Sequence, residues 1–150
     1  MSNRLYVLFP SVFASTALAS CGGVTGVSEI VEVTVELDQP FVAKNKPVRV
    51  TVTVTNRGRR TVTVTAKGCP SPFDIIDSGG SRVGPAPEQC TLELVLTHLA
   101  PSENLSFTRL WDGDGLPAGE YLIVGRITTT EGVVRGAAEN LALVEDFHGL

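Results

Sequence analysis

The sequence predicts an all-β domain, an immunoglobulin-like antiparallel β-sandwich of seven to eight strands that is preceded by a signal peptide. The first observation is a two-residue alternation of apolar and polar side chains, which recurs along the chain and is typical of half-buried strands. The second is an abundance of valine and threonine in short runs separated by glycine and proline turns. The third is the absence of any apolar 3.6-residue period of helical length.

Residues 1–20 have the features of an export signal. Arg4 gives a weakly basic start, and the uncharged run up to Ala19 is shorter than the roughly 20 residues that a membrane-spanning helix needs. Its end, the tetrapeptide LASC, resembles the bacterial lipobox that a lipoprotein signal peptidase recognises. The resemblance implies that Cys21 takes a diacylglycerol and becomes the new N-terminus, so that acyl chains anchor the protein. The alternative is an ordinary signal peptide cut near Ala19, which leaves Cys21 as a free cysteine.

The chain is expected to divide into a lipoprotein signal peptide at 1–20, a short lipidated tether at 21–28 and one β-sandwich domain at 29–147. Removal of the signal peptide leaves 11 basic against 16 acidic residues, a net charge of −5. Nucleic-acid binding needs patches of lysine and arginine, and no basic run occurs. The charge therefore argues against a nucleic-acid partner.

Cys69 and Cys90 remain once Cys21 is assigned to a lipid. An even pair in an exported chain predicts a disulfide, which would close a loop of about 20 residues and stabilise the fold by roughly 3 kcal/mol in the chain-entropy model. The alternative adds His98 to make a metal site, but these ligands have irregular spacing without a CxxC or HxxxH pattern. The disulfide is the prediction, and no metal site is expected.

The strands can be assigned in order along the chain. Residues 31–37 alternate valine and leucine with glutamate and threonine, while 48–55 and 61–65 alternate valine mainly with threonine, so each has one apolar and one wet face. Between the last two, residues 56–59 (NRGR) have the composition of a hairpin turn. Whether residues 128–140 form one strand or a loop stays open. Further strands are predicted at 73–77, 91–99, 104–111, 119–128 and 139–145.

The predicted core consists of the apolar side chains that share one phase within these strands. Its members are Val50, Val52, Val62, Val64, Phe73, Ile75, Leu94, Leu96, Phe107, Trp111, Tyr121, Ile123 and Ile127.

Several motifs follow one another in a specific order between residues 48 and 127. A valine–threonine strand ends in Asn56, FD stands at 73–74, DSGG at 77–80, and a tryptophan precedes LPAGEY at 116–121. This order resembles the BsuPI-type domain, a family named for the intracellular proteinase inhibitor of Bacillus, and implies an immunoglobulin-like sandwich. The APSE turn and the segment SRVGPAPEQC depart from the family pattern. The positions that match are Asn56, Phe73, Asp74, Asp77, Gly79, Trp111, Pro117, Gly119, Tyr121 and Gly125.

Catalytic motifs are not found in the sequence. Neither GxSxG nor HExxH occurs, and the two histidines, His98 and His148, have no nucleophile at a recognisable spacing. His98 is expected to be a partly exposed strand residue. The chain is therefore predicted not to be an enzyme and to need no cofactor.

The sequence DGDG at 112–115 raises the alternative of a calcium site shared with Glu120. An EF-hand loop that began at Asp112 would place Leu116 and Pro117 where an oxygen ligand and a glycine are required. Asp112 and Asp114 are instead expected to form a turn after the strand that contains the tryptophan.

The sequence thus predicts a non-catalytic interaction module of the bacterial cell envelope, at the outer membrane or periplasmic face in a Gram-negative cell. Its expected partners are the membrane, through a lipid on Cys21, and an envelope protein. The alternative is a proteinase inhibitor that acts through the exposed segment 79–89, which prolines and the predicted disulfide would pre-organise. The candidate contact residues of this loop are Ser81, Arg82, Val83, Pro85, Pro87 and Glu88.

Overall fold

The computed structural model describes residues 30–67, 71–86, 94–113 and 115–145. The secondary structure is built from strands, which confirms the predicted all-β class. Within these residues, no helix has the length and apolar character to cross a membrane. The predicted signal peptide and tether lie outside the described residues, as do Cys21, Cys69, Cys90, Pro87, Glu88, Asp114 and His148.

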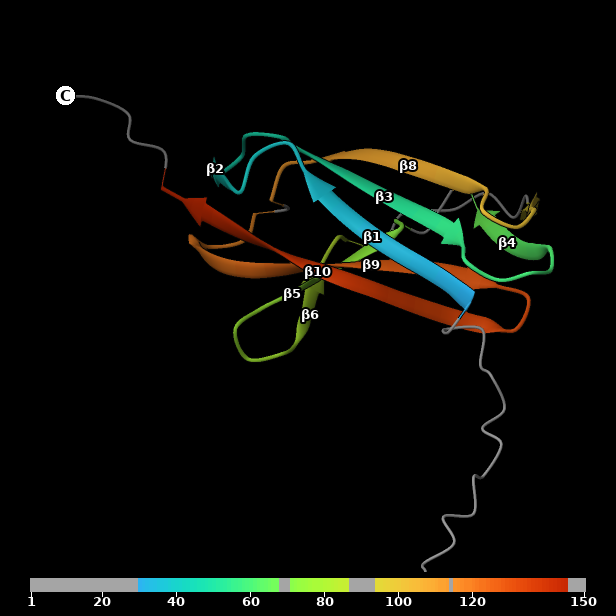
Figure 1. Cartoon of the computed structure of the whole chain (residues 1–150). Coiled ribbons are helices and arrows are strands. Elements are labelled where there is room, and N and C mark those ends of the chain that lie inside the picture. Colours follow the sequence, from blue (N-terminus) through green and yellow to red (C-terminus); the bar gives the residue numbers. More distant parts are fainter. Residues whose placement is uncertain (1–29, 68–70, 87–93, 114, 146–150) are drawn as a thin grey trace, which may run out of the picture.

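The strands form two layers, which confirms the predicted sandwich (Figure 1). The small layer is a three-stranded antiparallel sheet of order β1-β3-β8. Its valines alternate with polar residues as predicted, because one face of the sheet packs on the other layer and the other face meets solvent. The bounds are β1 (Val31–Leu37), β3 (Val48–Asn56) and β8 (Asn104–Trp111).

The large layer is a sheet of order β2-β10-β9-β4-β7, to which β5 is added by pairing with β9, and β6 by pairing with β5. The chain has more strands than the seven to eight expected, because β2 and β6 are three-residue strands without a clear alternation. The bounds are β2 (Phe41–Ala43), β4 (Val62–Lys67), β5 (Phe73–Ile76), β6 (Arg82–Gly84), β7 (Leu94–Leu99), β9 (Gly119–Thr129) and β10 (Gly132–Val144).

The C-terminal part of the sheet answers the question left open at residues 128–140. β9 and β10 form a long antiparallel hairpin, and a register shift between Arg135 and Ala138 bends β10 over the sandwich. At its end β10 pairs with β2 in parallel. The sequence predicted an antiparallel sandwich, and this parallel pair of strands departs from that prediction.

The connection 56–59 is not the hairpin turn that its composition predicted. β3 belongs to the small sheet and β4 to the large one, so this segment carries the chain from one layer to the other. Asn56 is fully buried, and its side-chain amide donates hydrogen bonds to the carbonyl oxygens of Arg60 (2.8 Å) and Leu99 (2.9 Å). Its Oδ1 accepts a hydrogen bond from the backbone N–H of Gly58 (2.9 Å). These three hydrogen bonds hold the segment in which the chain passes from the small sheet to the large one.

The core between the layers contains most of the predicted side chains. The prediction was wrong at Leu96, which is 49% exposed, because β7 is an edge strand whose inward phase is set by the buried Leu99. Phe107 is only half-buried on β8, and the side chain of Leu94 lies outside the description. The confirmed members are Val50, Val52, Val62, Val64, Phe73, Ile75, Trp111, Tyr121, Ile123 and Ile127.

Two glycines mark the places where the layers approach most closely. A Cβ on Gly125 would lie 2.8 Å from Val33 Cγ1 and 2.9 Å from Val35 Cγ2, in the middle of the interface. A Cβ on Gly136, at the bend of β10, would overlap the backbone carbonyl oxygen of Val33. Glycine at these positions lets β9 and β10 pack directly against β1.

Candidate interaction site

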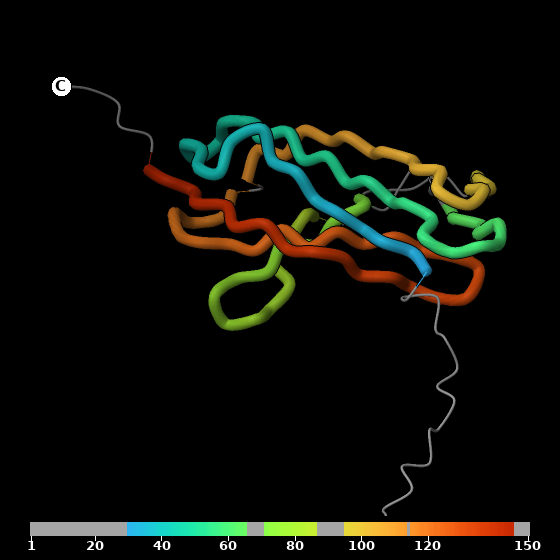
Figure 2. The backbone as a smooth tube through the Cα atoms, in the orientation of Figure 1, coloured from blue at the N-terminus to red at the C-terminus, as the bar shows by residue number. Residues whose placement is uncertain are grey.

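The loop between β5 and β6 extends away from the body of the sandwich, below the large sheet in the view of Figure 2. It contains the first part of the predicted contact segment. Ser81 and Arg82 are exposed, whereas Val83 is half-buried against the core. Pro85 is buried at the base, so its predicted role as a contact residue was wrong.

The tip of this hairpin is held by its own hydrogen bonds. The Asp77 carboxylate accepts bonds from the backbone N–H groups of Gly79 (2.9 Å) and Ser81 (2.8 Å). Across the turn, the Asp77 N–H donates to the Ser81 carbonyl (2.9 Å), and the Gly80 N–H donates to the Asp77 carbonyl (3.0 Å). Gly80 has φ +81°, a left-handed conformation that glycine adopts without strain. The sequence DSGG therefore specifies a tight, pre-organised tip.

The base of the hairpin is held by a buried carboxylate. The Asp74 side chain is 5% exposed, and its Oδ1 accepts a 2.7 Å hydrogen bond from Arg82 Nε. Arg82 Nη2 also donates to the Pro85 carbonyl (3.0 Å), which ties β6 to the chain that follows it. Arg126 on β9 and Arg135 on β10 lie farther away, at 3.7 Å and 4.0 Å from the Asp74 oxygens.

Pockets lie against the hairpin in two places. One of about 280 Å³ lies between the hairpin and the outer face of β9 and β10, where Leu122 and Asn140 contribute to it. Another of about 310 Å³ lies between the hairpin and residues 116–121. Tyr121 borders both, and its hydroxyl donates a 2.8 Å hydrogen bond to the Pro117 carbonyl, which fixes the ring. The hairpin thus borders concave surface on two sides.

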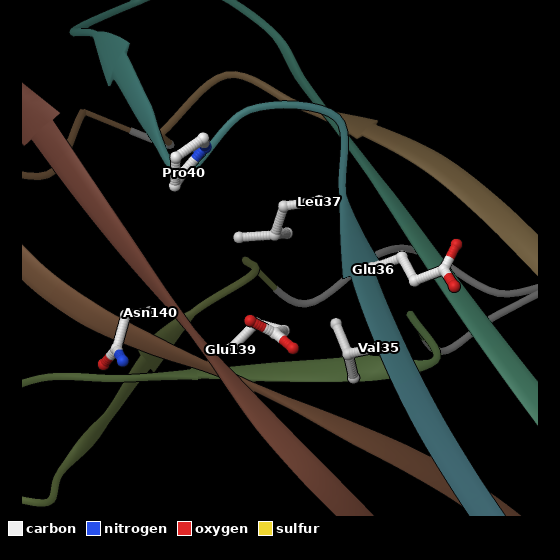
Figure 3. A pocket seen from close by; sticks show the side chains of 6 residues that line it. All are labelled: Val35, Glu36, Leu37, Pro40, Glu139 and Asn140. Atoms are coloured by element: carbon white, nitrogen blue, oxygen red, sulfur yellow. The ribbon is translucent and has the colours of Figure 1, made fainter.

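A further pocket of about 310 Å³ lies between β1 and β10 and shares Asn140 with the 280 Å³ pocket (Figure 3). Val35 and Leu37 form its apolar part, and Glu139 turns into it from β10. The close-up shows the Glu36 carboxylate directed away from Glu139, so the two do not converge on one point.

The metal-site alternatives gain no support from the described residues. Within them, no group of three or more histidine, cysteine, aspartate and glutamate side chains could hold an ion. His98 is exposed on β7, as predicted, and its Nδ1 shares a 2.9 Å hydrogen bond with Thr63 Oγ1 on β4. Asp112 and Glu120 are exposed on either side of the loop that follows β8.

Arg126 and Arg135 are possible site residues that no sequence motif indicates. The alternation in β9 indicates that Arg126 points outward, but no spacing shows that Arg135 is its cross-strand partner. The sequence indicates Asp74 only through the family resemblance. The pairing of β5 with β9 and of β9 with β10 brings these residues together.

Comparisons with known proteins identify the fold but no family. No family model matches the chain, and no curated protein matches it. The C-terminal domain of wzt is 10% identical with a TM-score of 0.50, covering 79% of this chain and 75% of that one. The CARDB domain of the PF1109 protein from Pyrococcus furiosus, solved in complex with di-metal ions, is 18% identical with a TM-score of 0.48, over 77% of this chain and 94% of that one.

At these identities the likeness extends to the fold alone. The chain is an all-β sandwich. The BsuPI-type resemblance and the lipobox at Cys21 stay predictions, as does the Cys69–Cys90 bridge.

Proposed function

We propose that the protein is a non-catalytic, lipid-anchored envelope module that binds a partner protein through the β5–β6 hairpin. The observation that carries this proposal is the hairpin itself, which projects from the sandwich and is fixed internally by Asp77. A pre-organised element loses little conformational entropy on binding, so contacts made by it contribute more fully to affinity. The two adjoining pockets offer recesses for side chains of the partner.

The proteinase-inhibitor alternative, which the BsuPI-type resemblance implies, has less support from this geometry. An inhibitor that imitates a substrate must present an extended segment to the protease cleft. Residues 79–81 instead form a tight turn, and the cationic head of Arg82 is engaged by Asp74. Inhibition would therefore require the hairpin to enter the protease cleft as a folded turn, without imitating an extended substrate.

The proposed anchor is a lipid on Cys21, supported by the resemblance of LASC to the lipobox. We expect the intact mass of protein from a bacterial membrane fraction to equal a chain that starts at Cys21 plus acyl groups. The same spectra should shift by about two daltons on reduction if Cys69 and Cys90 are bridged. An unmodified chain that retains residues 1–20 would contradict the lipid anchor but not the proposed binding of a partner through the hairpin.

The proposed contact is tested by photo-crosslinking in the intact envelope. A photoreactive amino acid at Ser81, which is exposed on the hairpin, should give a discrete adduct with one partner protein. The matched control position is Arg49, which is exposed on the outer face of the small sheet and should give none. Adding Asp77→Ala should lower the Ser81 adduct severalfold, because it removes two hydrogen bonds that hold the tip.

Equal adducts from Ser81 and Arg49, or none from either, would contradict the proposed role of the hairpin. A discrete adduct with a protease, together with slowed hydrolysis at low molar excess of the protein, would favour the inhibitor alternative instead.

A further inference from the structure

Three arginines gather around one carboxylate on the outer face of the large sheet. Arg82 from β6, Arg126 from β9 and Arg135 from β10 surround Asp74 of β5, and we call this group the arginine cluster. Arg126 and Arg135 are direct cross-strand partners, and Asp74 is paired with Val124 on the neighbouring strand. Four strands therefore fix the positions of these side chains.

Among the described residues, the arginine cluster is not neutralised internally. Three guanidinium groups face one carboxylate, which leaves an excess of two positive charges on a chain whose net charge is −4. Of the three arginines, only Arg82 lies within hydrogen-bond distance of Asp74. The arginine side chains remain 31–66% exposed, so their donors can reach a ligand. The buried Nε of Arg126 has no hydrogen-bond partner among the described residues.

The outer face beside the arginine cluster carries apolar side chains on β9. The outward side chains that precede Arg126 on β9 are Leu122 and Val124, and the 280 Å³ pocket begins at Leu122. Asp77 and Glu120 also line this pocket, at the end away from Arg126, whereas Glu139 lines the separate pocket between β1 and β10 (Figure 3). The face beside the hairpin therefore combines an excess of positive charge at the arginine cluster with a small recess whose apolar part is formed by Tyr121 and Leu122.

We infer that this face binds an acidic segment of the partner protein, with carboxylates on the arginine cluster and an apolar side chain in the pocket at Leu122. This inference rests on the proposed function and names the chemistry of its partner. Guanidinium groups bind carboxylates through paired, charge-assisted hydrogen bonds, and Arg126 and Arg135 have donors left for them.

Charge complementarity favours a protein segment over an anionic membrane as the occupant. Recognition of anionic lipid commonly uses clusters of about four to eight basic residues. Here the excess is two charges, on a chain that is negative overall and is repelled by an anionic surface. The projecting hairpin also keeps a flat bilayer away from the sheet face beside it (Figure 2).

The test measures binding of a dye-labelled ten-residue polyglutamate peptide to the full chain by fluorescence anisotropy, with a polyglutamine peptide of equal length as reference. We expect polyglutamate to bind at least about fivefold more tightly and to weaken as salt is raised. The double substitution Arg126→Gln with Arg135→Gln should weaken polyglutamate binding roughly tenfold. The matched control, Arg49→Gln with Arg59→Gln, changes the net charge equally at exposed positions and should leave binding within about twofold.

Arg135→Gln alone, at a side chain that is 66% exposed, serves if the double variant does not fold, with an expected loss of about threefold. Equal binding of the two peptides, or equal losses in the site and control variants, would overturn the inference. Binding to vesicles that contain a quarter phosphatidylglycerol, abolished by the site variant while polyglutamate is not bound, would assign the face to a membrane instead. A hairpin crosslink at Ser81 that persists in the site variant would overturn the acidic-segment inference without affecting the proposed function.

Discussion

Gly136→Ala should destabilise the sandwich by about 3 kcal/mol and lower the melting temperature by roughly 10 °C. The added methyl group would overlap the Val33 carbonyl oxygen and lie 2.6 Å from the Val33 carbonyl carbon. Both atoms belong to the backbone of β1, which is held by pairing with β3 and cannot turn aside like a side chain. The overlap can therefore be relieved only if β1 and β10 separate, which opens the core between them.

Two glycines on β9 serve as controls, because smaller losses of stability are expected when they are replaced by alanine. Gly125→Ala places its methyl group 2.8–2.9 Å from the side chains of Val33 and Val35, which can shift, so a smaller loss of about 1–2 kcal/mol is expected. Gly119→Ala meets only ordinary contacts with Tyr121, from 3.7 Å, and should change stability by less than about 1 kcal/mol. Thermal melts in which all three variants behave alike would refute the close approach of β1 and β10.

Asn56→Ala should cost about 2–4 kcal/mol of unfolding free energy. The substitution removes the amide that donates to the carbonyl oxygens of Arg60 and Leu99, and it leaves the Gly58 N–H without its acceptor. Because Asn56 is fully buried, no water replaces these bonds without opening the structure. Chemical denaturation followed by the fluorescence of Trp111 measures the loss.

Asn56→Asp tests the same two donated hydrogen bonds more specifically. It keeps the shape but replaces the donor with an oxygen that faces two carbonyl oxygens, so it should destabilise at least as much as Asn56→Ala. The control is Asn104→Ala, at an exposed side chain on β8, which should change stability by less than about 0.5 kcal/mol. Wild-type stability in Asn56→Asp would show that the amide does not hold the crossing between the layers.

The sequence was informative wherever one strand face is buried and the other wet. Valine occupies every second position from Val31 to Val35 in β1 and from Val48 to Val54 in β3, and in both strands those valines form the core. The turn at Asp77 was also predictable, because the side chain and the two glycines of DSGG specify its hydrogen bonds locally. The class of fold and the position of the hairpin follow from such local patterns.

Features that depend on pairing between distant strands were not predictable in this way. Composition indicates a turn at 56–59 but does not distinguish a hairpin from a change of layer, which is decided by the burial of Asn56. Val95 and Leu96 are both apolar, so the phase of β7 was ambiguous until Leu99 was seen to face inward. The arginine cluster likewise unites residues from four strands that no sequence motif connects.

The close approach of Gly136 to Val33 also decides when the domain can fold. These residues lie about 100 positions apart in the sequence. The strands β1, β3, β4 and β5 all contact β9, which also comes late in the chain. During synthesis the early strands emerge from the ribosome before the strands on which they pack. The valine-rich segments are therefore expected to stay uncovered until β10 is available to pack on β1, and in that state they are prone to pair with other chains.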